Sequence, residues 1–332
     1  MGKEKLEKIL VSGAAGFVGS HLCDKLLERG HAVIGVDDLS SGSRDNLETC
    51  LAHANFEFVE GDVCDAGLVE KAVGECDAIA HLAAKKIPRY SDGLDTLTVN
   101  VKGTEMLLKS AAAKGCRFLF ASTSDVYGMN PDLPFSEESL CVLGPSYVTR
   151  WSYAVSKLFD EHLVFAYADR YKMPFSIVRY FGGYGPRQHS SWTGGPQAVF
   201  IDAAARNEPI EIHGDGLQTR SFMYIDDLVE ATYRALTHGA AVGRVINIGS
   251  PEEISILDLA KLIWGLVAGA EKPQFKFVPY KNLSRGYQDV RRRVPDLTEL
   301  KTLLDFESKY DLREGLSKTV EWRLKALAQE VS

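Results

Sequence analysis

The chain has 332 residues, of which 45% are hydrophobic, 25% charged and 10% aromatic. These proportions are typical of a folded globular protein, exclude disordered, collagen-like and coiled-coil chains, and predict two domains or one α/β domain with an appendage. The formal net charge of −7 argues against a nucleic-acid-binding protein, which depends on clustered cations, but it leaves room for one basic pocket.

The distribution of cysteines and apolar residues bears on the compartment. The six cysteines are scattered without a C-x-x-C pair, and the eight histidines show no metal-binding spacing, so we expect reduced thiols and no metal. The charged N-terminal segment does not resemble a signal peptide, and no apolar run approaches the roughly 18 residues that span a bilayer. We therefore expect a cytoplasmic protein that binds no membrane.

Short apolar runs alternate with segments of helical length in the first half of the chain. Strands are predicted at 8–13, 31–37, 56–62, 78–83, 118–122 and 175–181, and helices at about 17–29, 104–113 and 153–171. Apolar strands that alternate with helices predict a doubly wound parallel sheet of the Rossmann type, covered on both faces. Beyond residue 181 the chain is richer in turns, and shorter strands at 210–213 and 275–278 predict a smaller mixed α/β lobe.

A glycine-rich segment connects the first predicted strand to the first predicted helix. Gly13, Gly16 and Gly19 lie where a tight turn lets the backbone approach a pyrophosphate at the helix N-terminus. Asp37 ends the second strand, where a carboxylate accepts hydrogen bonds from the adenosine ribose and repels a 2′-phosphate. Asp62 follows the third strand and could meet the adenine amino group. The pattern predicts NAD rather than NADP.

Tyr153 and Lys157 lie four residues apart on a predicted helix and therefore share one face. An ammonium group at this distance is expected to lower the pKa of a phenol, so that Tyr153 could act as a base near neutral pH.

The glycine spacing resembles that of the extended short-chain dehydrogenase/reductase family, and further segments match the family in order. These segments are 81–84, 99–104, 122–128, 153–157, 179–186, 214–220 and 224–227. The resemblance covers nearly the whole chain and implies an NAD-dependent enzyme acting on a nucleotide sugar. In such an enzyme Thr123 would hold the substrate oxygen, while Tyr153 removes the proton from the 4-hydroxyl and the hydride passes to NAD.

The resemblance also implies which residues bind the cofactor and the substrate. The expected NAD contacts are Gly13, Gly16, Phe17, Val18, Gly19, Asp37, Ser40, Gly42, Asp62, Val63, Leu82, Ala83, Ala84, Asn100, Ser122, Tyr153, Lys157 and Tyr180. The expected substrate contacts are Lys86, Arg89, Gly182, Gln197, Arg220 and Arg293, with Arg220 on the diphosphate. The NAD-binding domain would comprise residues 1–181 and about 218–250, and the nucleotide-sugar lobe about 182–217 and 251–332. Homologues pair through two helices, so 105–113 and 151–171 are expected to form a homodimer.

The fate of the 4-keto intermediate stays open at this point. Thr123, Ser124 and Asp125 resemble the catalytic triplet of UDP-glucuronate decarboxylases and hexose 4,6-dehydratases, but there the third residue is a glutamate, one methylene longer. Segments 150–153 and 286–295 also resemble a decarboxylase, in which the arginine at position 293 meets the substrate; a guanidinium suits a glucuronate carboxylate.

Other segments favour a different reaction. Residues 189–197 and 212–222 resemble a subgroup that includes UDP-glucuronate 4-epimerases, and Gly182 replaces the asparagine usual in the family, which leaves room for a keto sugar to rotate. We therefore expect a 4-epimerase acting on UDP-glucuronate or a related UDP-hexose, with decarboxylase and 4,6-dehydratase as alternatives. The rivals from other classes are an NAD-sensing scaffold, which would have no use for an activated phenol, and a reductase that exchanges free NAD(P)H.

Overall fold

The protein was analysed as a computed structural model that describes residues 7–86, 93–192, 194–269, 272–283 and 288–330. Its centre is a seven-stranded sheet in the order β11-β6-β5-β4-β1-β2-β3, and every pairing in it is parallel. The strands are β1 (Lys8–Ser12), β2 (Ala32–Asp37), β3 (Phe56–Glu60), β4 (Ala78–His81), β5 (Arg117–Thr123), β6 (Phe175–Tyr180) and β11 (Arg244–Ile248). The six strands predicted for this sheet are confirmed, and β11 joins them from the second half of the chain.

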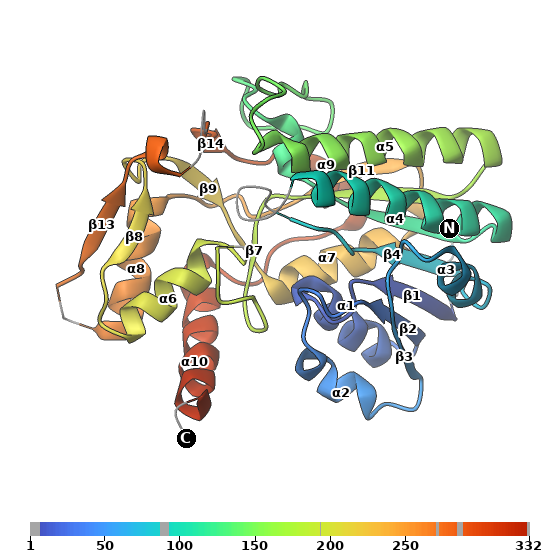
Figure 1. The fold of residues 1–332 in the computed structure, drawn as a ribbon, viewed down its shortest axis with the longest axis horizontal. Helices are drawn as coiled ribbons and strands as arrows, with labels where there is room; N and C mark the ends of the chain where they lie inside the picture. The colour runs from blue at the N-terminus through green and yellow to red at the C-terminus, as the bar shows by residue number, and fades with distance from the viewer. Residues whose placement is uncertain (1–6, 87–92, 193, 270–271, 284–287, 331–332) are drawn as a thin grey trace.

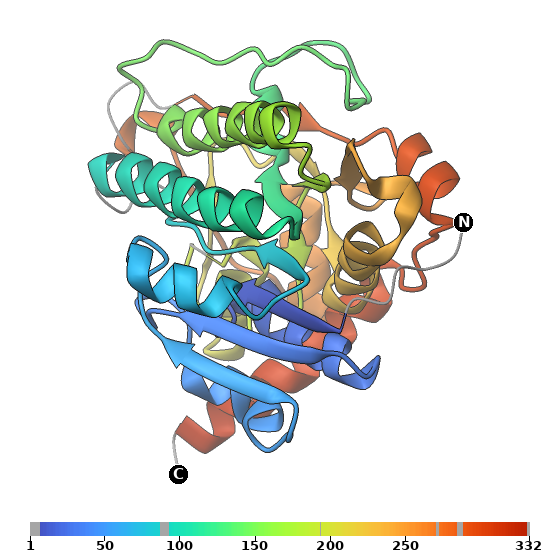
Figure 2. The same ribbon diagram turned by 90° about the vertical axis from the view of Figure 1, so that its right-hand side faces the viewer.

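Helices cover both faces of this sheet, which confirms the doubly wound architecture (Figure 1). One face carries α3 (Ala66–Val73), α4 (Gly93–Lys114) and α5 (Trp151–Tyr171), and Figure 2 shows α4 and α5 side by side. The other face carries α1 (Phe17–Glu28), α2 (Glu48–Leu51) and α7 (Ile225–Thr237). The helix predicted at 104–113 was too short, because the described helix already begins at Gly93. Its first turns contain Asp95, Asn100 and Gly103, which obscure the apolar periodicity seen from Leu107 onward.

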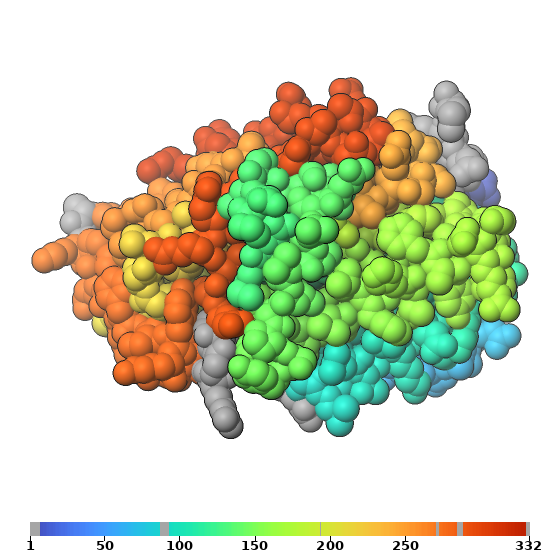
Figure 3. Space-filling view, turned by 90° about the horizontal axis from the view of Figure 1, so that it is seen from above, coloured from blue at the N-terminus to red at the C-terminus, as the bar shows by residue number. Residues whose placement is uncertain are grey.

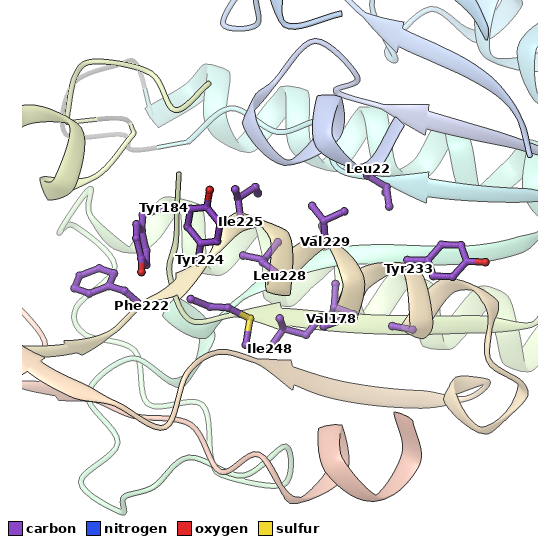
Figure 4. Close-up of a cluster of buried hydrophobic side chains, with 14 of the residues drawn as sticks. Leu22, Val178, Tyr184, Phe222, Tyr224, Ile225, Leu228, Val229, Tyr233 and Ile248 are labelled. Carbon is purple, nitrogen blue, oxygen red and sulfur yellow. The ribbon is translucent and has the colours of Figure 1, made fainter. Parts of the chain in front are cut away.

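The helix α7 was not predicted, although it supplies much of the core on its side of the sheet. Its side chains Leu228 and Val229 are 1% and 2% exposed. Figure 4 shows them between Leu22 of α1 and the strand residues Val178 and Ile248. Burial of an apolar helix face against a sheet is the main favourable contribution to such a layer.

Most of the second half of the chain forms smaller sheets and helices, grouped on the left of Figure 1. The strands β8 (Ile210–His213) and β13 (Phe275–Val278) pair in parallel and confirm two predicted strands. A three-stranded sheet joins β12 (Glu253–Ser255), β9 (Thr219–Ser221) and β14 (Arg292–Arg293), while β7 (Gly183–Tyr184) pairs with β10 (Met223–Tyr224). The helices here are α6 (Pro196–Ala205), α8 (Ile256–Ala268) and α10 (Leu312–Glu330), whereas α9 (Thr298–Leu304) packs against α7 and β11 of the central sheet.

Contacts across the molecule bring residues near 290 over the start of α5. The segment 128–150 crosses this face in green beside the C-terminal chain in Figure 3. Phe135 forms an isolated bridge with Pro295, and its backbone N–H donates to the Val294 carbonyl at 2.9 Å. These contacts hold Arg293 close to the carboxyl end of β5. None of the described helices combines the length and apolar character needed to cross a membrane.

Candidate active site

A cavity of about 770 Å³ lies at the carboxyl ends of the parallel strands and extends to the smaller sheets. The chain runs from β1 through β2 and β3 to one edge of the sheet and then returns through β4 to the other. The crevice between β1 and β4 is the place where doubly wound proteins bind ligands. The predicted cofactor residues on its wall are Gly13, Gly16, Phe17, Val18, Gly19, Asp37, Ser40, Gly42, Asp62, Val63, Leu82, Ala83, Ala84, Ser122, Tyr153 and Tyr180.

The glycine turn before α1 leaves no space for side chains. Gly13 has φ +73°, and a Cβ there would lie 2.9 Å from the backbone nitrogen of Ala83. A Cβ on Gly19 would lie 2.0 Å from the Gly13 carbonyl oxygen. Helix α1 begins after Gly16 with no side-chain cap and no acidic residue in its first turn. Because the first N–H groups of a helix lack partners within the helix, this wall fits a pyrophosphate.

Asp37 is held in a defined orientation beside the glycine turn. Its two carboxylate oxygens accept the backbone N–H groups of Ala15 at 2.9 Å and Leu39 at 2.8 Å. Burial raises the pKa of this carboxyl, and the two hydrogen bonds oppose that shift. Each oxygen keeps a second lone pair, so the carboxylate can also accept hydrogen bonds from the hydroxyls of a ribose.

The predicted catalytic residues meet where β5 ends and α5 begins. Thr123 ends β5, Ser124 and Asp125 follow in a 3-10 turn, and all three line the cavity with Tyr153. Lys157 lies one turn along α5, is 1% exposed, and places its Nζ 4.5 Å from the ring centroid of Phe120. The geometry therefore brings together the phenol, the hydroxyl and the ammonium that the sequence singled out.

The pKa of Tyr153 does not shift in the direction expected from the Tyr-Lys spacing. Burial raises it, and the negative charges of Asp125 and Asp160 raise it further. Burial lowers the pKa of Lys157 to about 8. The two residues do lie one turn apart on α5, but burial and the charges of Asp125 and Asp160, which the spacing does not reveal, determine the direction of the shift.

A buried ion pair supports the strand ends behind the catalytic residues. Arg179 on β6 donates to both carboxylate oxygens of Glu161 on α5, at 3.0 and 2.6 Å. Ser122 on β5 also donates to Glu161, and Arg179 donates to the Tyr127 hydroxyl at 3.0 Å. A bidentate pair with further partners holds three neighbouring elements in one arrangement.

Three arginines and two aspartates form the other end of the cavity, and we call them the arginine cluster: Asp125, Arg150, Arg220, Asp289 and Arg293. Arg293 forms an ion pair with Asp125, and Arg150 lies 3.7 Å from the same carboxylate. Asp289 lies 2.8 Å from Arg220 and 3.6 Å from Arg150. All five residues line the cavity.

The arginines determine the charge state of Asp125. Burial tends to raise the pKa of this carboxyl, but the charges of Arg293, Arg150 and Arg220 lower it more strongly. The result is an ionised carboxylate held between guanidinium groups at neutral pH. Arg150 and Asp289 were not predicted as site residues, although both lie in segments that resemble the decarboxylases.

The cavity has further walls that the sequence did not indicate. The Trp192 and His213 rings stack with their centroids 4.1 Å apart, and Gln218 donates to the His213 carbonyl oxygen at 2.9 Å. These three residues line the cavity with Gln188 and Phe222. They come from loops and from the end of β8, where local sequence carries no signal of a shared pocket.

Some predicted site residues do not reach the cavity surface. Lys157 and Asn100 lie behind its wall, where Asn100 donates to the Ser156 hydroxyl at 2.9 Å and accepts from the Lys85 backbone at 2.8 Å. Gln197 is 1% exposed in α6, whereas Lys86 and Gly182 line the cavity as predicted. Arg89 lies outside the described residues. Among those that are described, no group of three or more His, Cys, Asp or Glu side chains is placed to hold a metal ion.

The fold and the site together define an NAD-dependent enzyme of the short-chain dehydrogenase/reductase type, with its dinucleotide wall beside a Tyr-Lys pair. Residues 9–249 match the NAD dependent epimerase/dehydratase family, so the chain belongs to that family, and its cofactor is NAD.

The proteins similar to this chain include both decarboxylases and 4-epimerases of UDP sugars. It is 34% identical over 319 residues to the UDP-N-acetyl-alpha-D-glucosaminuronate decarboxylase of Bacillus cytotoxicus, covering 95% of this chain and 97% of the relative. It is 36% identical to UDP-glucuronic acid decarboxylase 1 of Xenopus tropicalis, covering 100% of this chain and 76% of the relative. The UDP-glucuronic acid 4-epimerase of Bacillus cereus, solved with UDP-glucuronic acid and NAD, is 31% identical with a TM-score of 0.87, covering 96% and 99% of the two chains.

Proposed function

We propose that this enzyme is an NAD-dependent 4-epimerase of UDP-glucuronate or a related UDP-hexose. The observation that carries the proposal is the ion pair between Asp125 and Arg293, with Arg150 close by. Because this ion pair keeps Asp125 deprotonated, the neutral Tyr153 phenol beside Thr123 remains as the acid and base. This arrangement suits a reaction that moves one proton and one hydride reversibly.

The opening step depends on residues at the junction of β5 and α5. Tyr153 takes the proton of the sugar 4-hydroxyl, Thr123 holds that oxygen, and Lys157 stabilises the tyrosinate by its charge. NAD, when bound along the glycine turn and Asp37, supplies the hydride acceptor. The base must lose its proton inside a buried site, so the positive charge of Lys157 has to compensate for the burial that raises the pKa of Tyr153.

The ionised state of Asp125 bears on the second step. A 4,6-dehydratase needs a carboxylic acid to protonate the departing hydroxyl, and a decarboxylase needs a proton donor at C5 after carbon dioxide leaves. Asp125 is deprotonated between guanidinium groups and is one methylene shorter than the glutamate of those enzymes. Epimerisation needs neither donor, because the hydride returns to the other face of the ketone.

The same cluster suits an anionic substrate. Arg293 and Arg150 already lie against the carboxylate of Asp125. The same guanidinium groups would bind the carboxylate of a uronate substrate. Arg220, on β9, would bind the diphosphate. Gly182 has φ +146°, a conformation that an asparagine adopts only with strain, which accounts for the glycine at this position.

Residues 1–181 with 218–250 would form the NAD domain, and the remainder the sugar-nucleotide lobe.

Decarboxylation of UDP-glucuronate is the second candidate. It is favoured by the sequence relatives, since the chain is 35–37% identical to UDP-glucuronic acid decarboxylases over 93–100% of its length. A decarboxylase of UDP-N-acetyl-alpha-D-glucosaminuronate is 34% identical. Arg293 next to Asp125 is also compatible with binding of the carboxylate that leaves. The two reactions share the 4-keto intermediate and differ only in its fate.

One experiment separates these reactions. The enzyme is incubated with NAD and, separately, with UDP-glucuronate, UDP-glucose and UDP-N-acetylglucosamine, and the products are analysed by mass spectrometry and NMR. An unchanged mass with an inverted C4 centre supports the proposal, whereas loss of carbon dioxide or water shows decarboxylation or dehydration. Net accumulation of NADH would instead indicate a reductase, and no product from any sugar would favour an NAD-sensing scaffold.

We also propose a homodimer formed through α4 and α5. Val155, Phe159 and Phe165 of α5 are 44%, 49% and 41% exposed, and Leu97 of α4 is 36% exposed. Apolar side chains on adjacent helices suit a symmetric helix-to-helix contact. Light scattering coupled to gel filtration would give twice the chain mass if this is right.

The six free cysteines fit a reducing, cytoplasmic location.

A further inference from the structure

Asp160 is a buried carboxylate in α5 that the proposed mechanism does not use. It lies three residues after Lys157 and is 0% exposed. Neither of its carboxylate oxygens has a hydrogen-bond partner of standard geometry among the described residues. A carboxylate in such surroundings is costly unless it takes up a proton or faces a cation.

A chain of buried hydrogen bonds leads from the cofactor edge of the sheet toward this carboxylate. The Ser12 hydroxyl at the end of β1 accepts the backbone N–H groups of Leu82 and Ala83, at 3.2 and 3.3 Å. It also lies 2.7 Å from Nδ1 of His81, and Nε2 of the same ring lies 3.0 Å from the Thr104 hydroxyl. The chain therefore connects the loop after β4 to α4.

The direction of these hydrogen bonds follows from their donors and acceptors. Burial and the charge of Lys157 lower the pKa of His81 well below its usual value, so the ring is neutral. Ser12 already accepts two N–H groups, so its own proton points to Nδ1, and the ring hydrogen lies on Nε2 and points to Thr104. The Thr104 proton is then available to Asp160, and this hydroxyl lowers the pKa of that carboxyl.

The charged groups that face Asp160 come from its own helix. Burial raises the pKa of Asp160 to about 6; the charge of Lys157 lowers it, and Glu161 raises it. For Lys157, burial lowers the pKa to about 8, Asp160 and Glu161 raise it, and Lys86 of the loop after β4 lowers it. Between these two values the carboxylate and the ammonium group are both charged.

We propose that Asp160 is a positioning residue, a buried counter-ion three residues along α5 that keeps Lys157 protonated. The hydrogen-bond chain from Ser12 ends at the nearby Thr104. The inference rests on the proposed role of Lys157 beside Tyr153. Without Asp160, burial and the neighbouring Lys86 remove the proton of Lys157 at neutral pH. The tyrosinate then loses its cation, and the enzyme loses activity on the alkaline side of its profile. Loss of the Asp160 charge also lowers the pKa of Tyr153, which opposes this effect without restoring the proton of Lys157.

The pH dependence of kcat/KM tests this proposal with variants that differ in charge. In Asp160→Asn we expect the alkaline limb to move down by at least one pH unit, a loss of roughly fivefold at pH 8 that approaches tenfold at higher pH. At pH 6 and below, wild type and variant converge, because the carboxyl of the wild type is itself protonated there. Asp160→Glu keeps the charge and should retain the wild-type limb. Asp169→Asn, an exposed site on the same helix, should leave the profile unchanged.

A uniform loss of activity at every pH in Asp160→Asn would show a structural role and overturn the proposal. The protonation of Lys157 is also measurable without substrate, by NMR of protein labelled at lysine Cε, with Lys157→Met to assign the signal. We expect this lysine to titrate near pH 8 in the wild type and lower in Asp160→Asn. If the Lys157 amine is neutral at pH 7 in the wild type, the inference is refuted. This measurement does not depend on the folding of Asp160→Asn or on which reaction the enzyme catalyses.

Discussion

The two ends of the cavity are built in different ways. The cofactor end is made of glycines, backbone N–H groups and aspartate carboxylates such as Asp37 and Asp62, which lie at the ends of β1, β2, β3 and β4. The arginine cluster at the other end carries five charged groups from four separate segments of the chain. The first end recognises a constant ligand through local backbone geometry, whereas the second adapts the enzyme to one substrate through side-chain charge.

Tyr153 lies where the two ends meet, so its variant should have the largest effect. Tyr153→Phe removes the proton acceptor, and we expect kcat to fall by roughly a thousandfold, within the range of general acid-base catalysis. NAD affinity, measured by fluorescence titration or calorimetry, should change less than about twofold, because the Tyr153 hydroxyl acts in the reaction rather than in binding the cofactor. Retention of more than a tenth of the activity would contradict the assigned base.

A second test addresses the substrate end alone. Arg293→Ala leaves Asp125 with a weaker partner and removes one guanidinium from the uronate site, so kcat/KM for UDP-glucuronate should fall roughly a hundredfold. For UDP-glucose, which lacks the carboxylate, the fall should be less than about fivefold by the same reasoning. Arg291→Ala is the matched control, because that side chain is 59% exposed and pairs with Asp215. Equal losses for both sugars would mean that Arg293 does not read the carboxylate.

A third test addresses the cofactor end. Gly13→Ala places a methyl group 2.9 Å from the Ala83 nitrogen at φ +73°, which should push the turn away from the pyrophosphate. We expect NAD affinity to fall by about tenfold or more. Gly30→Ala is the control, since Gly30 also has positive φ, +83°, but no atom within 4 Å of the added Cβ. It should lower Tm slightly and leave NAD affinity as it is; similar affinity losses in both variants would point to backbone strain alone.

The smallest expected effect concerns the choice between NAD and NADP. Asp37→Asn keeps the shape of the side chain but removes the charge that repels a 2′-phosphate. The ratio of NADP to NAD affinity should rise by about tenfold, which corresponds to roughly 1.4 kcal/mol. Titration of both cofactors measures it, and an unchanged ratio would show that another group excludes the phosphate.

Prediction from the sequence succeeded where structure and chemistry are local. The glycine turn, Asp37 and the Tyr-Lys pair each occupy a few consecutive positions whose geometry follows from one strand, one turn or one helix. The strands of the central sheet up to β6 were also predictable, because buried parallel strands are short apolar runs. Residues 218–250 were assigned to the NAD-binding domain from the family resemblance alone, and the elements α7 and β11 within them were not predicted, because the local pattern there does not show that the chain returns to the first sheet.

The sequence by itself therefore determined the fold class, the cofactor and the placement of Tyr153 and Lys157 on one helix. Tertiary structure alone decided that Arg150, Asp289 and Arg293 converge on one cavity, because residues far apart along the chain meet only through packing. It also decided the charge states. Burial reversed the shift expected for Tyr153, and packing enclosed both Asp160 and Lys157 in the interior. The free energy of a charge depends on what surrounds it rather than on its position in the sequence.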